Sequence, residues 1–198
     1  MIGAAYEIPE KALRIALTYG SAIDFRLDST ETFPTAVGGQ VVDGSTPISM
    51  PQSVNLDFQT GIAPKSLLIG SMRWTNYEGW EVRAPGLADN FDAILASKDY
   101  NIWTYKLGLG RQFTPHWAGA VQALYEPSIN KTLGPLNPTD GAFGVGLGGT
   151  YTTDKGIKVS GGAEYRWLGD SDIQGPFASA AFTDNDALGL GISITAPF

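Results

Sequence analysis

The sequence predicts an all-β protein, an up-and-down antiparallel β-barrel that crosses a membrane with its strands. Apolar and polar residues alternate with a period of two along much of the 198-residue chain. Short and long connections also alternate, and aromatic residues gather near both ends of the expected strands. We count about nine strands, at approximately 2–8, 12–28, 52–63, 67–80, 100–113, 117–126, 142–153, 157–168 and 186–198.

The composition excludes several other classes. Hydrophobic residues make up 43% of the chain, and its 25 glycines follow no Gly-X-Y period, which argues against disorder and a collagen-like helix. A net charge of -7 makes a nucleic-acid partner unexpected. The chain contains no cysteine, so it has no disulfides and no thiol chemistry. We expect no transmembrane helix, because no apolar run reaches about 18 residues.

The segment at 12–28 shows the strand pattern most clearly. Odd positions from Leu13 to Leu27 are mostly apolar, whereas Arg14, Asp24 and Arg26 occupy even positions. One strand with an apolar and a polar face explains both rows. The segment at 67–80 is less regular, because Leu67 and Ile69 share their face with Arg73. We therefore expect a bulge or a misplaced boundary there.

The connections alternate strictly in length. Short ones at 9–11, 63–66, 114–116 and 153–156 separate long ones at about 29–51, 81–99, 127–141 and 169–185. Outer-membrane barrels have short periplasmic turns and long extracellular loops. Two aromatic girdles fit this orientation, although aromatic residues are common in strands generally. The girdle residues are Tyr6, Phe113, Trp117, Tyr151 and Phe198 near the short turns, and Tyr77, Trp80, Trp103, Tyr125, Tyr165 and Trp167 near the long loops.

The end of the chain carries a further signal. Apolar residues alternate from Leu188 to Ile194, and the chain stops on Phe198. This pattern looks like the signal by which outer-membrane barrels are recognised for assembly. We therefore assign Ile194 and Phe198 to recognition by the barrel-assembly machinery.

Several stretches together resemble one family. They are Ala5-Tyr6-Glu7-Ile8-Pro9 followed by Leu13 to Ser21, Pro51-Gln52-Ser53-Val54 leading to Ala63-Pro64-Lys65, Arg73 to Trp80, and Asn137-Pro138-Thr139-Asp140-Gly141. The chain resembles the outer-membrane long-chain fatty-acid transporter family (FadL/TodX-like) along its whole length. The resemblance implies a fourteen-stranded barrel plugged by an N-terminal hatch. We therefore expect residues 1–198 to form a single partial barrel domain, without the hatch and early strands, that cannot close alone.

Candidate sites for other chemistry are weak. Gly144 to Gly149 match a dinucleotide-binding pattern, but they lie inside an expected strand instead of a strand-to-helix turn. These glycines either leave the inner wall bare or permit curvature. His116 is the only histidine and sits in a short turn, so neither catalysis nor metal binding is expected. Acidic pairs at Asp170 with Asp172 and Asp184 with Asp186 are read as solvated loop residues, with cation binding beside lipopolysaccharide as the alternative.

Two groups of residues are candidates for ligand contact. The polar faces place charges in the lumen, where they either meet a substrate carboxylate or form a structural network that holds the hatch; these are Arg14, Arg26, Asp57, Arg73, Lys106, Glu164 and Arg166. The loop at 29–51 is unusually apolar, and the resemblance implies an outer capture site there. Its candidate residues are Phe33, Val37, Val41, Val42, Ile48 and Met50, and packing against neighbouring loops is the alternative.

The sequence thus predicts a bacterial outer-membrane protein that passively transports long-chain fatty acids or other hydrophobic compounds. It is expected to be no enzyme and to need no cofactor or metal. The expected partners are a hydrophobic small molecule, the outer membrane with its lipopolysaccharide, and the assembly machinery. The alternatives are a small structural or adhesive outer-membrane barrel, and a soluble barrel that turns its apolar faces inward around a hydrophobic ligand.

Overall fold

Nine strands form one continuous antiparallel sheet, called the wall below. The computed structural model describes residues 1–129, 139–174 and 179–197. Each wall strand pairs with the next one along the wall, which confirms the up-and-down topology. In order, the strands are β1 (Ile2–Ile8), β2 (Leu13–Gly20), β5 (Ser53–Ala63), β6 (Ser66–Asn76), β9 (Asn101–Gln112), β10 (Trp117–Glu126), β11 (Ala142–Thr152), β12 (Lys158–Leu168) and β15 (Asn185–Thr195).

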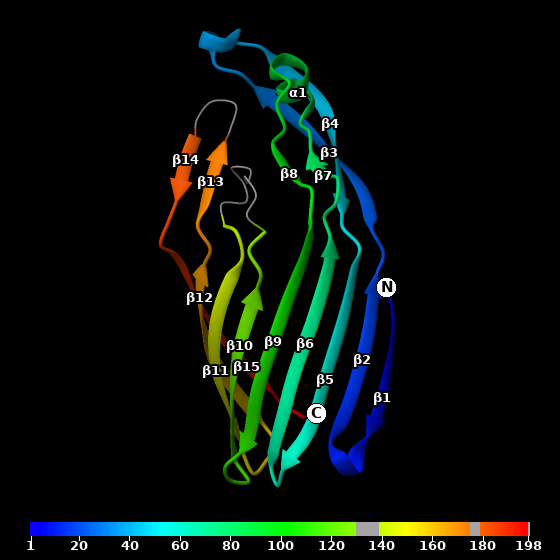
Figure 1. Cartoon of the computed structure of the whole chain (residues 1–198), viewed down its shortest axis with the longest axis vertical. Helices are drawn as coiled ribbons and strands as arrows, with labels where there is room; N and C mark the ends of the chain where they lie inside the picture. The colour runs from blue at the N-terminus through cyan, green and yellow to red at the C-terminus, as the bar shows by residue number, and fades with distance from the viewer. Residues whose placement is uncertain (130–138, 175–178, 198) are drawn as a thin grey trace.

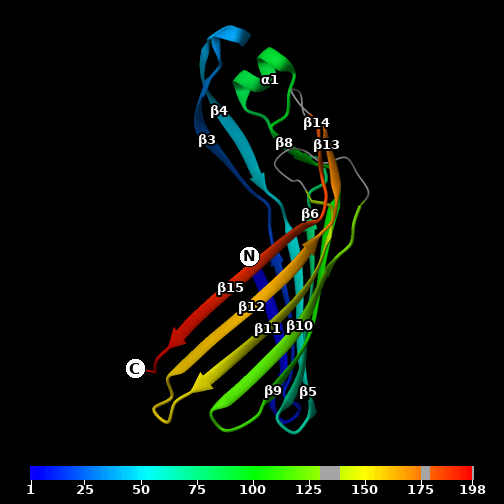
Figure 2. The same ribbon diagram turned by 90° about the vertical axis from the view of Figure 1, so that its left-hand side faces the viewer.

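The wall is an open, curved sheet. Strands β1 and β15 form its two edges, and in the described part of the chain they do not pair with each other. The tilt of the strands changes steadily across the sheet, so that β15 crosses the direction of β5 when the molecule is viewed edge-on (Figure 2). Short turns lie together at one end of the wall and long connections at the other (Figure 1), as the sequence predicts.

The prediction of one strand over 12–28 is wrong. The wall strand β2 ends at Gly20, and after Ser21 and Ala22 the chain enters β3 (Ile23–Thr32), which pairs with β4 (Val41–Met50) in a separate hairpin. The expected loop at 29–51 therefore consists largely of the end of β3 and the whole of β4. The alternation runs unbroken through this junction, and a period of two does not say which strand is the partner. Arg26 lies opposite Pro47 in this hairpin, so its placement on the lumen wall is also wrong.

The prediction for 67–80 needs a different correction. Strand β6 ends at Asn76 and pairs with β9 without a register shift. The irregularity in this part of the wall lies in β5, between Gly61 and Ala63. The mixed pattern arises because Leu67 and Ile69 are apolar residues on the polar face.

The other long connections also contain regular structure. Between β6 and β9 lie β7 (Trp80–Val82), the short helix α1 (Pro85–Phe91) and β8 (Ala96–Lys98); β13 (Ser171–Gln174) and β14 (Ser179–Phe182) form a hairpin before β15. Two 3-10 turns cover Pro9–Lys11 and Thr35–Val37. Among the described residues, no helix is long and apolar enough to cross a membrane.

The apolar face of the wall is the exposed one. Leu107, Leu147 and Ile192 expose 55%, 67% and 80% of their surface, whereas the polar neighbours Lys106 and Gln122 are half-buried. This pattern contradicts the soluble-barrel alternative, in which apolar side chains would face inward and be buried. It fits a wall whose apolar face meets lipid.

Aromatic side chains contact one another near both ends of this apolar face. Near the short turns the rings of Trp117 and Tyr151 lie 4.9 Å apart, and near the long loops those of Phe143 and Trp167 lie 5.7 Å apart. Tyr125 pairs with Phe143 and is separated from Trp117 by eight residues of β10, about 26 Å along the strand. This spacing is consistent with two girdles around an apolar band about 25 Å tall.

Candidate functional site

The strand register places the predicted lumen charges on one face. Asp57 lies opposite Ser71, which in turn lies opposite Lys106, and Arg14 lies one step closer to the short turns, opposite Gln59. A hollow of about 230 Å³ opens between these strands and is lined by Arg14, Asp57 and Lys106. The polar face is therefore the hollowed inner face, and three predicted residues share one hollow.

A second hollow, of about 410 Å³, lies nearer the long loops. Arg73, Lys106, Glu126 and Arg166 line it. Glu126 accepts a hydrogen bond from Thr104 Oγ1 at 3.1 Å. Lys106 thus borders both hollows and links the two groups of predicted residues.

The cations on this face differ in their partners. Arg166 forms an ion pair with Glu164, which also accepts a hydrogen bond from Gln122 at 2.9 Å, and Arg14 pairs with Glu7 at 2.9 Å on the exposed edge. Within the described residues, neither Arg73 nor Lys106 forms an ion pair with a carboxylate. Lys106 and Arg73 therefore retain charge that a ligand can use.

Apolar side chains lie beside these cations on the same face. Ile69 is half-buried and borders the first hollow, and Leu124 is 3% exposed opposite Lys106. The alternation hid this feature, because Leu67 and Ile69 were read as an irregularity and Leu124 was not singled out. An inner face with both charge and apolar surface suits an amphiphilic ligand better than a purely polar pore does.

The glycine-rich segment lies within β11, which has no helix after it in the described residues. It therefore lacks the strand-to-helix turn that a dinucleotide site needs. Gly146, Gly148, Gly189 and Gly191 line a hollow of about 480 Å³ on the inner face. A Cβ built on Gly148 or Gly189 lies 3.4 or 3.8 Å from the nearest described atom, so the bare wall leaves real space.

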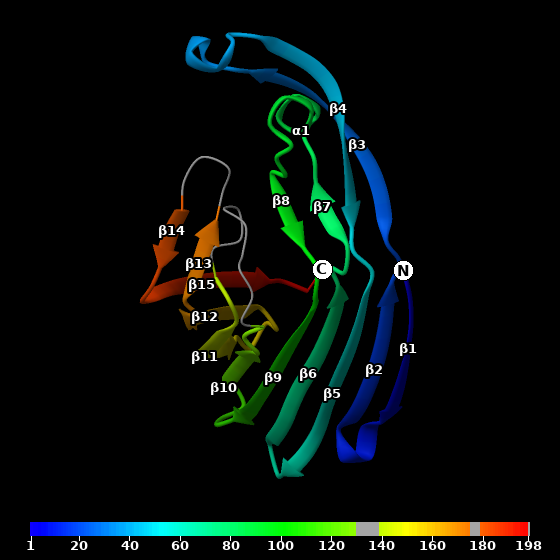
Figure 3. The same ribbon diagram turned by 45° about the horizontal axis from the view of Figure 1, so that its top comes forward.

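The connection that carries the predicted capture residues packs against the next long connection. We call this unit the loop assembly (residues 23–50 and 80–98). The β3–β4 hairpin extends past the wall and bends beside α1 (Figure 3). The Glu31 carboxylate accepts hydrogen bonds from the backbone N–H groups of Gly86 at 2.7 Å and Leu87 at 2.8 Å. The ring of Phe33 lies 5.5 Å from that of Phe91.

Two further contacts hold the base of the loop assembly. Trp80 Nε1 donates a hydrogen bond to the Ser49 carbonyl at 2.6 Å. The Lys98 ammonium lies 4.5 Å from the centre of the Tyr77 ring. Burial lowers the pKa of Lys98, because desolvation disfavours the charged ammonium more than Glu126 stabilises it.

The predicted capture residues therefore divide into two groups. Phe33 contacts α1 through Phe91, and a Cβ on Gly86 would lie 3.0 Å from Val42, so these two pack within the assembly. Ile48 is half-buried. Val37, Val41 and Met50 remain accessible, with 42%, 60% and 55% of their surfaces exposed.

The buried acid Asp140 ties two long connections to the wall. It is 7% exposed and accepts hydrogen bonds from Ser128 Oγ at 2.6 Å and the Ile129 N–H at 2.8 Å. The Asp140 N–H donates to Gly169 O, and the Gly169 N–H donates to Gly141 O. Sequence reasoning noted this segment only as part of a resemblance and missed its anchoring contacts.

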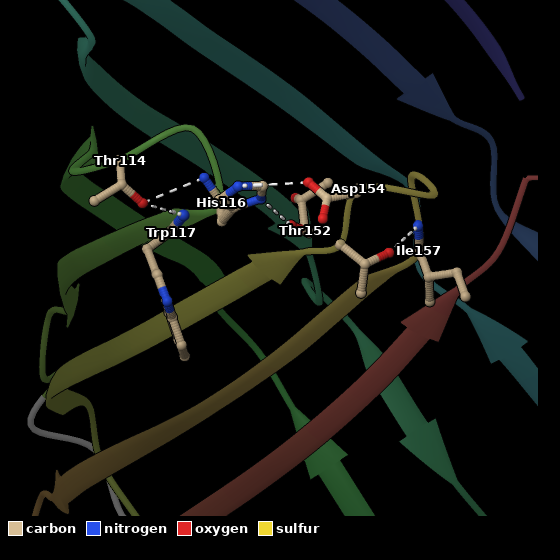
Figure 4. A network of polar contacts seen from close by, with 7 residues as sticks. Thr114, His116, Trp117, Thr152, Asp154 and Ile157 are labelled. Atoms are coloured by element: carbon tan, nitrogen blue, oxygen red, sulfur yellow. Dashed lines mark hydrogen bonds and ion pairs between the residues drawn. The ribbon is translucent and has the colours of Figure 1, made fainter.

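His116 links two neighbouring short turns (Figure 4). Its Nδ1 lies 2.9 Å from the Thr152 carbonyl oxygen and its Nε2 lies 3.7 Å from Asp154 Oδ1. Thr114 Oγ1 accepts hydrogen bonds from the backbone N–H groups of His116 and Trp117. These contacts give the His116 ring a structural role between the two turns.

The described residues contain no group of three or more His, Cys, Asp or Glu side chains able to hold a metal ion. Asp170 accepts a hydrogen bond from the backbone N–H of Asp184 and Asp186 accepts one from Tyr165, so both take part in local loop and strand contacts. Ile194 lies opposite Val159 with 69% of its surface exposed. Phe198 lies outside the described residues, and the assembly role of both residues stays a prediction.

With this geometry established, comparison with known proteins identifies the family. The family model for outer membrane protein transport proteins (OMPP1/FadL/TodX) matches residues 1–198. The chain belongs to this family. Its members are transporters and channels of the bacterial outer membrane and are not enzymes, so this protein is an outer-membrane protein without an enzymatic role.

Solved structures of the same family share the fold. A FadL homologue from Pseudomonas aeruginosa is 14% identical with a TM-score of 0.71, and the match covers 97% of this chain and 48% of that one. The monoaromatic hydrocarbon channel CymD is 14% identical with a TM-score of 0.58 over 99% of this chain and 50% of that one.

The Pseudomonas putida toluene transporter TodX is 15% identical with a TM-score of 0.51 over 82% of this chain and 42% of its own. The chain thus spans about half the length of these structures. No curated protein matches it significantly.

Proposed function

We propose that the protein forms part of a passive outer-membrane pathway for hydrophobic compounds, and that long-chain fatty acids are among them. The carrying observation is that two cations without an ion pair in the described residues lie beside apolar side chains on the inner face. Arg73 and Lys106 border hollows that Ile69 and Leu124 also approach. Such a surface offers a counter-charge to a carboxylate and apolar contact to its chain.

The loop assembly supplies the point of entry in this scheme. Val37, Val41 and Met50 expose apolar surface on the connection that contains the β3–β4 hairpin, and this hairpin extends past the end of the wall (Figure 1). Phe33 and Val42 pack against α1 near the tip of the same hairpin. We therefore assign first contact to the three exposed residues and a structural role to the packed ones.

The experiment compares two solutes that differ in charge. Uptake of radiolabelled dodecanoate and of toluene is measured in cells whose uptake depends on this protein. The double variant Arg73→Gln with Lys106→Gln is expected to slow dodecanoate uptake about tenfold at low concentration, because the carboxylate loses both counter-charges. Toluene uptake is expected to stay within about twofold.

The matched control is Lys158→Gln, which removes a cation from the inner-face row of β12 near the short turns. It should leave uptake of both solutes unchanged. Equal dodecanoate uptake by the double variant and the wild type, at equal amounts of folded barrel, would remove the fatty-acid part of the proposal. Loss of toluene uptake to the same extent would show a general defect of the channel.

The same assay separates the two groups of capture residues. Val41→Ser with Met50→Ser should reduce uptake of both solutes while leaving the contacts of α1 intact. Normal uptake of both solutes by this variant would show that the ligand does not first contact the loop assembly. A small structural or adhesive barrel, the alternative, would show no uptake that depends on either residue group.

A further inference from the structure

The outward rows of the wall carry very few charges. The strand registers assign each wall residue either to the inner face or to the outward, lipid-facing one. Among the outward residues of the nine described wall strands, only Arg111 and Asp186 are charged. The other charged side chains of these strands, such as Lys106 and Glu164, belong to the inner rows. Because a charge that faces lipid is unfavourable, each of the two outward charges should have a partner.

Asp186 has its partner within the wall. It lies opposite Trp167 at the long-loop end of β15, and the Tyr165 hydroxyl donates a hydrogen bond to its carboxylate. The rings of Tyr165 and Trp167 lie 4.8 Å apart. A side chain of the same wall therefore satisfies this carboxylate among the aromatic residues of one girdle.

Arg111 has no such partner among the described residues. It lies between Ser66 of β6 and Gly119 of β10, in the same outward row as Leu109 and Phe113. Arg111 is exposed, and so are its two row neighbours, with 50% of Leu109 and 64% of Phe113 accessible. The ion pairs found in the described part of the chain do not include Arg111. Its positive charge thus faces the membrane without an anion from these residues.

The place of Arg111 in its row sets its depth in the membrane. Phe113 belongs to the girdle near the short turns, whereas Tyr105 lies further toward the long loops. Arg111 is two residues, about 7 Å, from Phe113 and six residues, about 20 Å, from Tyr105. Its guanidinium can therefore snorkel to the phosphate level of the nearer leaflet. Short turns of outer-membrane barrels face the periplasm, so this leaflet is the periplasmic one.

We propose that Arg111 binds the phosphate of a glycerophospholipid in the periplasmic leaflet, with the acyl chains lying against Leu109 and its cross-strand neighbour Val121. A guanidinium donates paired hydrogen bonds to phosphate oxygens, and such a pair is stronger at the edge of the membrane core than in water. Lipopolysaccharide occupies the opposite leaflet, which leaves the phosphodiester of a phospholipid as the anion at this depth. The site goes beyond the proposed function, because it is the same whichever solute crosses the wall.

The test is native mass spectrometry of the full-length protein in a maltoside detergent, with phosphatidylethanolamine or phosphatidylglycerol added at limiting concentration. The wild type is expected to retain one molecule of either lipid above the nonspecific background, because both carry the phosphodiester. Diacylglycerol, which lacks it, should bind poorly. Arg111→Gln should lower the occupancy of both phospholipids about tenfold, the loss expected for one charge-assisted pair. Arg111→Lys keeps the charge and should retain most of the occupancy.

The matched control is Lys158→Gln, which removes an inner-face cation near the short turns, opposite Thr152. It should bind both phospholipids as the wild type does, and heat-modifiable migration on gels confirms that each variant is folded. Wild-type occupancy in Arg111→Gln, or equal binding of diacylglycerol and phosphatidylglycerol, would overturn the proposal. Displacement of the phospholipid by excess inorganic phosphate would show a site for free anions and overturn the lipid assignment.

Discussion

The wall and the loop assembly are stabilised in opposite ways. In the wall, long backbone ladders join the strands and large apolar side chains such as Leu147 and Leu190 stay exposed. In the loop assembly, paired strands are short or isolated, and side chains such as Glu31 and Phe33 hold α1 against a hairpin. The surrounding medium explains the difference, because lipid demands complete backbone pairing and tolerates exposed apolar surface, whereas water does not.

This contrast also separates two kinds of functional residue. The wall presents Arg73 and Lys106 on rigid paired strands, which suits a site of fixed geometry. The loop assembly presents Val41 and Met50 on a hairpin whose position depends on a few side-chain contacts. We therefore expect substitutions in the wall to affect assembly and solute choice, and substitutions in the loop assembly to affect capture.

The largest expected effect is a charge placed on the apolar face of the wall. Leu17→Lys should reduce the stability of the folded barrel by about 2–4 kcal/mol if position 17 lies near the middle of the bilayer. Thr18→Lys places the same charge on the polar face of the same strand and should be tolerated. Urea unfolding from liposomes measures both variants, and equal stabilities would contradict the assignment of the two faces.

A smaller effect is expected when the loop assembly loses its cap. Glu31→Ala removes the acceptor of the Gly86 and Leu87 N–H groups, at a cost of about 1–2 kcal/mol. Hydrogen exchange should accelerate in residues 85–91 and stay unchanged in the wall strand β12. Thr30→Ala, which removes a hydrogen bond to Asp43 from the same hairpin, is the matched control. Faster exchange throughout β12 would show that the two regions are not independent.

The pair of His116 and Asp154, which lie in neighbouring short turns, should contribute still less to stability. Asp154 is almost fully exposed and lies 3.7 Å from His116, so Asp154→Asn should change stability by less than about 1 kcal/mol. His116→Ala also removes the contact with the Thr152 carbonyl and should cost more. Thermal unfolding in detergent compares the stabilities of the two variants. A greater loss of stability in Asp154→Asn than in His116→Ala would show that the charge of Asp154 matters more than the contact with the Thr152 carbonyl.

The smallest effect concerns pH. The pKa of Lys98 is lowered in the folded protein by desolvation, so the folded state releases this proton more readily than the unfolded state does. The loop assembly should therefore gain stability as the pH rises from the lowered pKa of Lys98 toward the ordinary lysine pKa of about 10.4. Lys98→Met should abolish this slope in the protease resistance of residues 80–98. A slope of opposite sign would contradict the desolvation argument.

The sequence alone determined the up-and-down order of the wall strands and their two faces. A period of two identifies which residues share a face, and alternating connection lengths identify which ends lie together, because both are local properties of a strand meander. The inner-face positions of Asp57, Lys106 and Glu164 followed from this pattern, as did the exposed apolar face. Leu67 and Ile69 were misread only because an inner face is allowed to carry apolar residues.

Tertiary structure decided what alternation does not encode. Phe25 and Leu27 continue the apolar row of β2, yet the chain leaves the wall after Gly20 and pairs β3 with β4. The partners of Glu31 lie 55 and 56 residues away in α1, and nothing in the local sequence around Glu31 specifies them. A hollow of about 710 Å³ at the short-turn end of the wall likewise joins the ends of four strands and a turn, which only the folded wall brings together. The face on which a strand residue lies depends on the local sequence alone. Which distant residues contact each other, and where hollows form between strands, depends on how the folded chain packs.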